Sequence, residues 1–233
     1  MAAACAQAGR ELDTVRLLAV SKTFGFDTII QAWSAGQYAF GENYIQEGIE
    51  KMAALRSAYP QAPIEWHCIG PVQSNKTRLV ATQFDWVQSV DRLKIAQRLS
   101  DQRPDGIPPL QICLQVNIDG GANKSGVKVS DLRALADAVA GLPRLHLRGL
   151  MCIPEPVEGF AAQRNVFEQA RALFDDLNAC GFALDTLSMG MSDDLDAAIA
   201  AGSTLVRVGK AVFGHRPSPT SPNALDKTPV YPD

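Results

Sequence analysis

The sequence lacks long apolar runs and any strongly basic stretch. Its 233 residues carry 22 basic and 25 acidic side chains, which leaves a formal net charge of -3. No cluster of Lys and Arg offers a footprint for a phosphate backbone, so we expect no nucleic-acid partner. The longest apolar stretches have strand length, and the first ten residues are too weakly hydrophobic for a secretory signal. We therefore expect no membrane association and a cytoplasmic location.

Metal-binding patterns are absent as well. The 3 histidines lie apart, and neither H-E-x-x-H nor a Cys/His ligand spacing occurs, so we predict no metal site. The 5 cysteines are odd in number and form no C-x-x-C pair. Most of them fall inside predicted strands as small apolar residues, which fits a reducing compartment.

Strand-like apolar runs alternate with amphipathic helical patterns along most of the chain. This alternation is typical of βα units in a parallel sheet. Eight such units predict a single-domain (β/α)8 TIM barrel. An open doubly wound sheet is the alternative, and the absence of G-x-G-x-x-G after the first strand disfavours it. The predicted strands end near Val20, Gly41, Gly70, Val90, Ile118, Ile153, Gly190 and Gly209.

Helix signals and composition divide the chain further. The clearest helices are 44–59, 132–142 behind an N-cap at Ser130 or Asp131, 160–180 with Gly181 as C-cap, and 193–201 ending at Gly202. We assign 1–214 to the barrel and the proline-rich 215–233 to a flexible C-terminal tail. No helix is predicted after the last strand, and about ten residues precede the first. The short Ala-rich start, or a partner subunit, must therefore cover the gap in the outer ring.

Lys22 is the first candidate for chemistry. It stands at the C-terminal end of the apolar run Val15-Arg-Leu-Leu-Ala-Val-Ser-Lys-Thr23, where a buried strand would deliver its amine into the mouth of the barrel. Burial makes an ammonium easier to deprotonate and therefore nucleophilic, so the position suggests an imine-forming amine. The simpler interpretation is a lysine that reaches solvent.

A phosphate site is indicated after the seventh and eighth strands. Phosphates in such barrels commonly lie on backbone N–H groups there, and small residues let the main chain approach an anion. Ser188, Gly190 and Gly209 stand at these ends. An amine on strand one together with this cradle describes a site for a phosphorylated aldehyde, of which pyridoxal 5′-phosphate (PLP) is the commonest.

The same segments resemble the pyridoxal-phosphate homeostasis protein family over about residues 17–214. The matching motifs are Ala19-Val-Ser-Lys22, Phe40-Gly-Glu-Asn-Tyr44, Trp66-His67, Ile69-Gly-Pro71, Gln73-Ser-Asn-Lys76, Lys124-Ser-Gly126, Arg148-Gly-Leu-Met151, Leu187-Ser-Met-Gly-Met-Ser-Asp-Asp194 and Val206-Arg-Val-Gly209. The resemblance implies a barrel of the alanine-racemase N-terminal domain type, with PLP held as a Schiff base on Lys22.

The resemblance also implies roles around the cofactor. It puts Ser188 and Gly209 at the phosphate and Arg207 at the pyridine nitrogen. A guanidinium that donates to this nitrogen keeps it unprotonated and weakens the ring as an electron sink, so little turnover is expected. Many relatives have Thr or Ser where this chain has Lys210, so we assign only the backbone N–H of Lys210 to the phosphate. Asn43 is a ligand to the cofactor ring or its Schiff-base surroundings, or a turn-forming asparagine.

Other polar residues have simpler interpretations. His67 is expected to be a satisfied core or rim residue rather than a catalyst. Asp193 and Asp194 are expected to complement the start of a helix. Lys76 and Lys124 follow strand ends and either are solvated or line the mouth.

Three function classes fit these features. The first is a PLP-binding protein that stores or carries the cofactor, with apo PLP-dependent enzymes as partners and no residue assigned to catalysis. The second is a PLP-dependent racemase or related amino-acid enzyme, and the third is a lysine-dependent aldolase without PLP. Only residues 215–233 follow Gly214, so we expect no second domain that would close over a substrate and supply an opposing acid–base group. This expectation favours the carrier.

Overall fold

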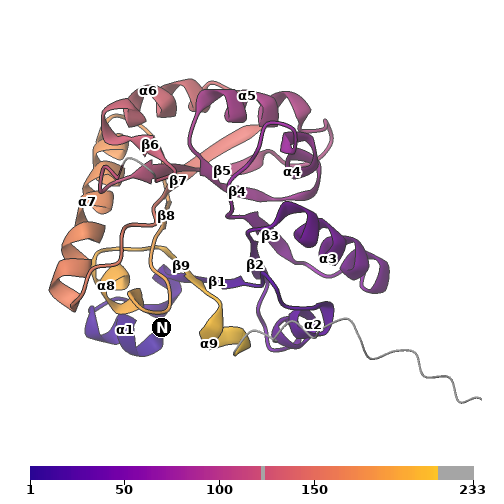
Figure 1. The fold of residues 1–233 in the computed structure, drawn as a ribbon, viewed down its shortest axis with the longest axis horizontal. Coiled ribbons are helices and arrows are strands. Elements are labelled where there is room, and N and C mark those ends of the chain that lie inside the picture. Colours follow the sequence, from indigo (N-terminus) through magenta and orange to yellow (C-terminus); the bar gives the residue numbers. More distant parts are fainter. Residues whose placement is uncertain (122–123, 215–233) are drawn as a thin grey trace, which may run out of the picture.

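The computed structural model describes residues 1–121 and 124–214, which form a ring of parallel strands surrounded by helices (Figure 1). The strands are β1 (Arg16–Val20), β2 (Ala39–Glu42), β3 (Glu65–Cys68), β4 (Trp86–Val90), β5 (Leu110–Asn117), β6 (Val127–Lys128), β7 (Leu145–Met151), β8 (Thr186–Ser188) and β9 (Leu205–Val208). The helices are α1 (Ala2–Gln7), α2 (Phe26–Ser34), α3 (Ile45–Ala58), α4 (Thr77–Gln83), α5 (Leu93–Gln102), α6 (Val129–Ala140), α7 (Phe160–Ala179), α8 (Leu195–Ala200) and α9 (Lys210–Phe213), with a 3-10 turn at Leu12–Thr14.

The strand order closes the sheet into a barrel. Neighbouring strands follow the order β4-β3-β2-β1-β9-β8-β7-β5, and β4 pairs with β5 to complete the circle. Every one of these pairings is parallel. The short β6 pairs in parallel with the end of β5. The (β/α)8 barrel prediction is confirmed, and the doubly wound alternative is wrong because an open sheet has no such closure.

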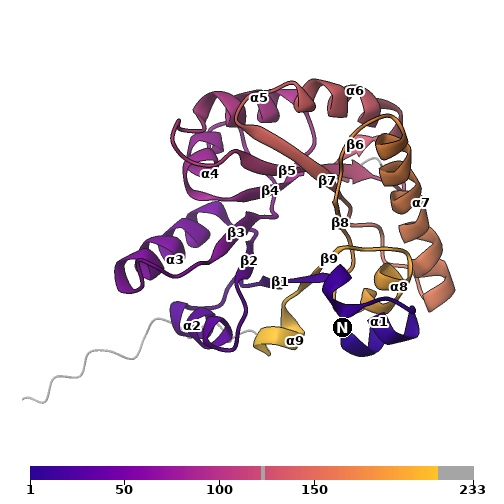
Figure 2. The same cartoon turned by 180° about the vertical axis from the view of Figure 1, so that it is seen from behind.

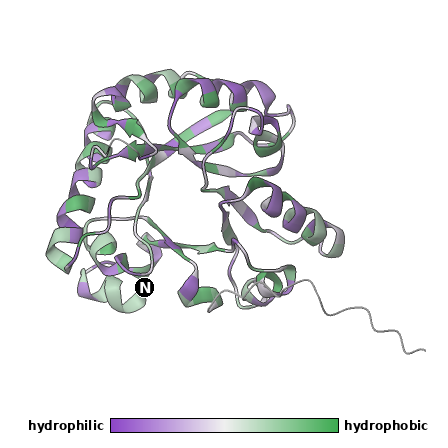
Figure 3. Cartoon of the chain, viewed as in Figure 1, coloured by the Kyte–Doolittle hydropathy of each residue, from purple (hydrophilic) through white to green (hydrophobic). Residues whose placement is uncertain are grey.

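Most helices lie outside the strands with one apolar face turned inward. In Figure 3 the longer helices carry both hydrophobic and hydrophilic residues along their length. The main core lies between helices and strands, where Phe40, Phe84 and Phe167 are almost fully buried. Because each parallel strand is covered on both faces, β4 is buried at all five positions instead of alternating.

Helix α1 covers the gap in the outer ring that the sequence left open. Ala4 and Cys5 of α1 are buried against Ile199 of α8 and Val206 of β9. Figure 2 shows α1 beside α8, outside β9. The Ala-rich start of the chain therefore does the covering. The predicted tail, 215–233, lies outside the described residues.

Two helix predictions hold at their C-terminal ends. Gly181 follows α7 with φ +96°, and the N–H groups of Gly181 and Phe182 donate to Asn178 and Leu177 carbonyls. Gly202 follows α8 in the same left-handed region. Glycine occupies both positions because this backbone conformation costs it no side-chain clash.

Two helix boundaries differ from the predictions, and one helix is present that was not predicted. Helix α6 begins at Val129, before the predicted caps, because residues 127–128 pair with β5 and lead straight into it. Helix α8 begins only at Leu195, since the Asp194 carboxylate accepts a 2.6 Å bond from the Met191 N–H and holds the preceding residues in a turn. A one-turn helix, α9, does follow the last strand. Its Phe213 ring packs on the Phe24 ring, with 4.9 Å between the ring centroids.

The buried cysteines behave as apolar residues. Burial raises the pKa of Cys68, Cys113 and Cys152 to about 12, so their thiols are not nucleophilic at neutral pH.

Within 1–121 and 124–214, no helix is long and apolar enough to cross a membrane. The same residues contain no group of three or more His, Cys, Asp or Glu side chains arranged to hold a metal ion.

Candidate functional site

A cavity of about 710 Å³ opens at the C-terminal ends of the barrel strands. Residues from the ends of β1, β2, β3, β7, β8 and β9 meet there, as the parallel topology requires. Its lining consists of Val20, Lys22, Phe24, Asn43, Ile69, Ile153, Met191, Ser192, Asp193, Arg207, Gly209, Lys210 and Gly214. Five of the seven residues predicted for cofactor binding are brought together, namely Lys22, Asn43, Arg207, Gly209 and Lys210.

A tight turn carries Lys22 just beyond β1. The Phe24 N–H donates to the Ser21 carbonyl at 3.1 Å, which closes the turn. Thr23 has φ +69°, an uncommon conformation for a residue with a branched side chain. The Glu47 carboxylate accepts a 2.6 Å bond from the Thr23 N–H and holds this conformation. The turn fixes the backbone on both sides of Lys22.

A buried ion cluster lies beneath this turn, between the end of β2 and α3. The Lys51 ammonium is 2.8 Å from Glu42 Oε1, 2.5 Å from Glu47 Oε1 and 2.8 Å from the Ser21 carbonyl. The Ser21 hydroxyl donates to the same Glu42 oxygen at 2.6 Å. Burial raises the pKa of Glu42, and the bonds from Lys51 and Ser21 oppose that rise. The sequence predicted no role for either residue, although Glu42 belongs to the motif Phe40-Gly-Glu-Asn-Tyr44 and Lys51 stands at i,i+4 to Glu47.

Arg207 extends from β9 into the barrel and is 4% exposed. Its Nη1 donates to the Ser188 carbonyl at 2.9 Å and to the Ser188 hydroxyl at 2.7 Å. Its Nη2 donates to the Cys152 carbonyl at 2.9 Å. Burial lowers the pKa of Arg207, although an arginine keeps its proton in proteins. The guanidinium is therefore a fixed cation in the cavity wall.

Ser188 and Gly190 do not line the cavity. The Ser188 side chain is fully buried in the barrel interior, where its hydroxyl donates to Gln88 Oε1 at 2.6 Å. Gly190 has φ +92°, and a Cβ there would lie 2.4 Å from the Ala198 Cβ, so this glycine lets α8 pack against the strand end. Ser192 takes a place on the cavity wall instead, within the motif that pointed to Ser188.

Gly209 lies at the junction of β9 and α9. Its carbonyl accepts the N–H groups of Val212 and Phe213, which starts the helix. A Cβ on Gly209 would lie 3.3 Å from the Val20 carbonyl, so glycine keeps β1 and β9 close beside the cavity. Lys210 follows as the first residue of α9.

The residues with simpler interpretations are placed as follows. His67 is fully buried and hydrogen-bonded at both ring nitrogens, as expected of a satisfied core histidine. Asp194 holds a loop rather than capping α8, and Asp193 lines the cavity. Lys76 does not line the cavity. Lys124 pairs with Glu155 at 3.1 Å and donates to the Ile153 carbonyl at 3.2 Å, which ties two loops together at the mouth.

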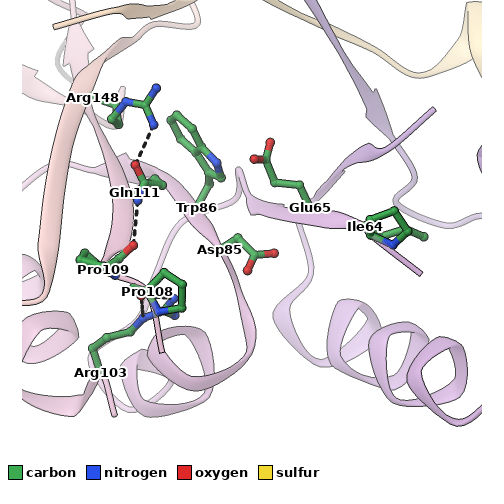
Figure 4. Close-up of a pocket in the computed structure, with 10 residues that line it drawn as sticks. Ile64, Glu65, Asp85, Trp86, Arg103, Pro108, Pro109, Gln111 and Arg148 are labelled. Atoms are coloured by element: carbon green, nitrogen blue, oxygen red, sulfur yellow. Dashed lines mark hydrogen bonds between the residues drawn. The ribbon is translucent and has the colours of Figure 1, made fainter. Parts of the chain in front are cut away.

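A second cavity, of about 410 Å³, lies at the opposite end of the barrel, where the strands begin. Figure 4 shows Glu65, Asp85 and Trp86 on its wall beside Arg103 and Arg148. Both arginines are engaged internally, Arg103 with backbone carbonyls and Arg148 with Asp185 and Gln111. The lining of this second cavity contains none of the residues predicted for cofactor binding.

Comparison with known proteins gives consistent results. The family model for the alanine racemase N-terminal domain matches residues 2–217. A pyridoxal phosphate homeostasis protein of Pseudomonas aeruginosa is 58% identical over 209 residues, which is 90% of this chain and 88% of the relative. The protein of the same name from Escherichia coli is 50% identical over 216 residues, covering 93% and 92% of the two chains.

Solved structures agree with these sequences. PipY of Synechococcus elongatus, solved with PLP bound, is 36% identical with a TM-score of 0.80, covering 90% of this chain and 97% of that one. Alanine racemase of Clostridium difficile shares the fold at 15% identity and a TM-score of 0.72, and this chain spans 56% of it. The chain therefore belongs to the pyridoxal phosphate homeostasis protein family, whose fold is that of the alanine racemase N-terminal domain.

Proposed function

We propose that this protein binds PLP in the cavity at the C-terminal ends of the strands and serves PLP homeostasis as a store or carrier of the cofactor. The observation that carries the proposal is the meeting of Lys22, Arg207 and Gly209 in one cavity. A relative of the same family, PipY, has been solved with PLP bound. PLP supplies an aldehyde that reacts with amines, together with a phosphate that a cationic site retains.

The cavity fits such a ligand in size and charge. Its volume of about 710 Å³ falls within the range of about 300–1,000 Å³ that is usual for small-molecule sites. Among residues 1–121 and 124–214, three basic side chains, Lys22, Arg207 and Lys210, line it against one acidic side chain, Asp193. This excess of positive charge suits a phosphate dianion.

Each residue would then have a defined task. The amine of Lys22 would bind the aldehyde carbon covalently, held in place by the turn at Thr23. Arg207 would donate to the pyridine nitrogen. The phosphate would lie against Gly209, the backbone of Lys210 and Ser192, because Ser188 and Gly190 do not line the cavity. Asn43 would contact the ring from the end of β2.

The carrier role is favoured over catalysis by the nature of Arg207. A permanently protonated guanidinium donates to the ring nitrogen and keeps it unprotonated, which weakens the ring as an electron sink. Apo PLP-dependent enzymes are the partners that such a carrier would serve. The second candidate, an amino-acid racemase, is favoured by the shared fold. Fold alone does not carry an activity.

The binding proposal is tested by the absorbance spectrum of the purified protein with PLP. We expect a yellow protein with an absorbance band of the PLP–lysine adduct that shifts on reduction. Borohydride reduction should leave a pyridoxyl group on the peptide that contains Lys22. Lys22→Ala should lose the adduct and keep the fold. An adduct on another lysine, with the full band retained in Lys22→Ala, would contradict the assignment.

The choice between carrier and enzyme needs a second assay. The loaded protein is incubated with L- and D-amino acids while racemisation, decarboxylation and transamination are followed. A parallel sample is mixed with an apo PLP-dependent enzyme, and recovery of that enzyme's activity reports transfer. We expect transfer without substantial turnover. Turnover on the order of 1–10³ per second for any amino acid would favour the racemase class.

A further inference from the structure

A hydrogen-bonded chain of side chains crosses the barrel interior from Arg207 to the opposite end. Arg207 donates to the Ser188 hydroxyl at 2.7 Å, and that hydroxyl donates to Gln88 Oε1 at 2.6 Å. Gln88 Nε2 lies 2.8 Å from His67 Nδ1. Since β4 and β8 are not neighbours in the sheet, the bond between Ser188 and Gln88 spans the inside of the barrel.

The far end of the chain reaches the second cavity. His67 Nε2 is 2.7 Å from Glu65 Oε1, and Arg16 donates to the same oxygen at 2.7 Å. Glu65 lies on the wall of that cavity in Figure 4. Burial alone would raise the pKa of Glu65, but the hydrogen bonds from His67 and Arg16 and the positive charge of Arg16 lower it below its usual value of 4.5. This end of the chain is therefore a carboxylate above pH 4.5.

The carboxylate sets the direction of every bond in the chain. A carboxylate accepts only, so His67 Nε2 carries the proton and donates to Glu65. Neutral His67 then accepts at Nδ1 from the Gln88 amide nitrogen. The Gln88 oxygen must in turn face Ser188, whose hydroxyl hydrogen points at it. The lone pairs of Ser188 Oγ are thereby left for Arg207.

Neutral His67 is a condition for this order. Burial lowers the pKa of His67, and Glu65 opposes the effect. The charged groups that act on His67 are Glu65, Arg16 and Asp85, and Arg148 lies over the indole of Trp86 on which His67 is stacked. A second proton at Nδ1 would force the Gln88 amide to turn over, and Ser188 would then lose its acceptor.

We propose that Gln88 and His67 are positioning residues for Arg207. They orient the Ser188 hydroxyl and so fix the guanidinium in the cavity wall, without contacting the cofactor themselves. This inference rests on the proposed function, since Arg207 is the group expected at the PLP ring. All four residues of the chain from Arg207 to His67 are at most 4% exposed, so water does not substitute for a lost link.

The first test is Gln88→Met, which keeps the volume and removes both links. We expect PLP affinity to fall about three- to tenfold, as for the loss of a buried hydrogen bond. The absorbance band of bound PLP should shift as well, because the partner of its ring nitrogen moves. Gln111→Met is the matched control. Gln111 lies at the other end of the barrel, bonded to Pro109 and Arg148 and outside the chain.

The second test is Gln88→Glu, which separates positioning from simple packing. A glutamate accepts from Ser188 but cannot donate to His67, so it restores the chain only when His67 takes up a proton at Nδ1. We expect its PLP affinity, relative to wild type at each pH, to recover as pH falls from 8 to 6. Gln88→Met should show no such recovery. Urea unfolding of each apo-variant reports whether the fold is kept.

The outcomes separate the two proposals. Wild-type protein that fails to bind PLP would overturn both. Wild-type binding, with folded Gln88→Met equal to Gln111→Met in affinity and band position, would overturn the positioning role alone. If Gln88→Met does not fold, Ser188→Ala tests the next link with a smaller change. A Ser188→Ala protein with wild-type affinity and spectrum would also overturn the role.

Discussion

At the scale of single residues, glycines and turns decide how closely the chain approaches itself around the cavity. Gly190 separates the end of β8 from α8, and a Cβ there would meet the Ala198 Cβ at 2.4 Å. Gly36, after α2, has nearly the same backbone, with φ +94° against +92°, but a Cβ there would meet nothing within 4 Å. Substituting each glycine in turn therefore separates the free-energy cost of backbone strain from that of a steric clash.

We expect Gly190→Ala to lower the free energy of unfolding by more than Gly36→Ala does. Both variants lose the freedom of glycine at positive φ, which costs about 1 kcal/mol. Only Gly190→Ala adds a steric clash, which should destabilise the protein by about 1–3 kcal/mol more. Urea denaturation of both variants measures the difference. Equal losses would show that α8 moves aside freely.

At the scale of elements, α3 and β2 together hold the loop that carries Lys22. Lys51 from α3 joins Glu42 at the end of β2, the Ser21 carbonyl and Glu47. Glu42 is fully buried, and its Oε2 has no hydrogen-bond partner among the described residues. The negative charge of Glu42 is compensated at Oε1 by the Lys51 ammonium. The buried carboxylate therefore depends on Lys51 for its stability.

We expect Lys51→Met to destabilise the protein by about 3–5 kcal/mol, because it leaves a buried carboxylate without its cation. Adding Glu42→Gln to Lys51→Met removes the uncompensated charge and should recover part of the loss. Urea unfolding of wild type, Lys51→Met and the double variant measures these differences in the free energy of unfolding. A double variant less stable than Lys51→Met would contradict the charge explanation.

Helix α1 is the second element with a testable role, as the cover over α8 and β9. Ala4 is 4% exposed in this contact, whereas Ala3 next to it is exposed. Ala4→Glu places a charge in the contact and should cost about 1–3 kcal/mol, whereas Ala3→Glu should change stability by less than about 0.5 kcal/mol. Thermal unfolding of both variants is the measurement. Similar values would mean that α1 contributes little cover.

At the scale of the whole molecule, the barrel combines a small apolar cluster with a polar chain of hydrogen-bonded side chains. Leu18, Ala39, Ile69 and Leu205 form one buried cluster. The chain from Arg207 to Glu65 crosses the interior and ends near solvent, where the Glu65 side chain is 32% exposed. The stability of the molecule should therefore respond to pH through this carboxylate.

The pH prediction follows from the pKa of Glu65, which is lowered from 4.5 to about 2. A lowered carboxyl pKa contributes stability that is present above pH 4.5 and is lost as pH falls towards 2. Solvent screening of the partly exposed group keeps this contribution to about 1–2 kcal/mol. Glu65→Gln should therefore be less stable than wild type at pH 6, with a smaller difference at pH 3. A difference that does not change with pH would contradict this origin.

The sequence by itself determined the architecture and the place of the site. Alternating apolar runs and helical patterns predicted the barrel, and the predicted strand ends fall within two residues of those observed. Because parallel strands end at one rim, Lys22, Arg207 and Gly209 had to meet there. The family motifs then indicated which ligand to expect.

Only the tertiary structure decided where individual side chains point and what supports them. Ser188 stands at the predicted strand end, yet its hydroxyl lies inside the barrel between Gln88 and Arg207, and Arg207 rather than Ser188 lines the cavity. The i,i+4 spacing of Glu47 and Lys51 on α3 is local, but Gln88 lies 100 residues from Ser188 in the sequence, so no local spacing reveals their bond. Such contacts depend on how the strands close and the helices pack, which local sequence patterns do not encode.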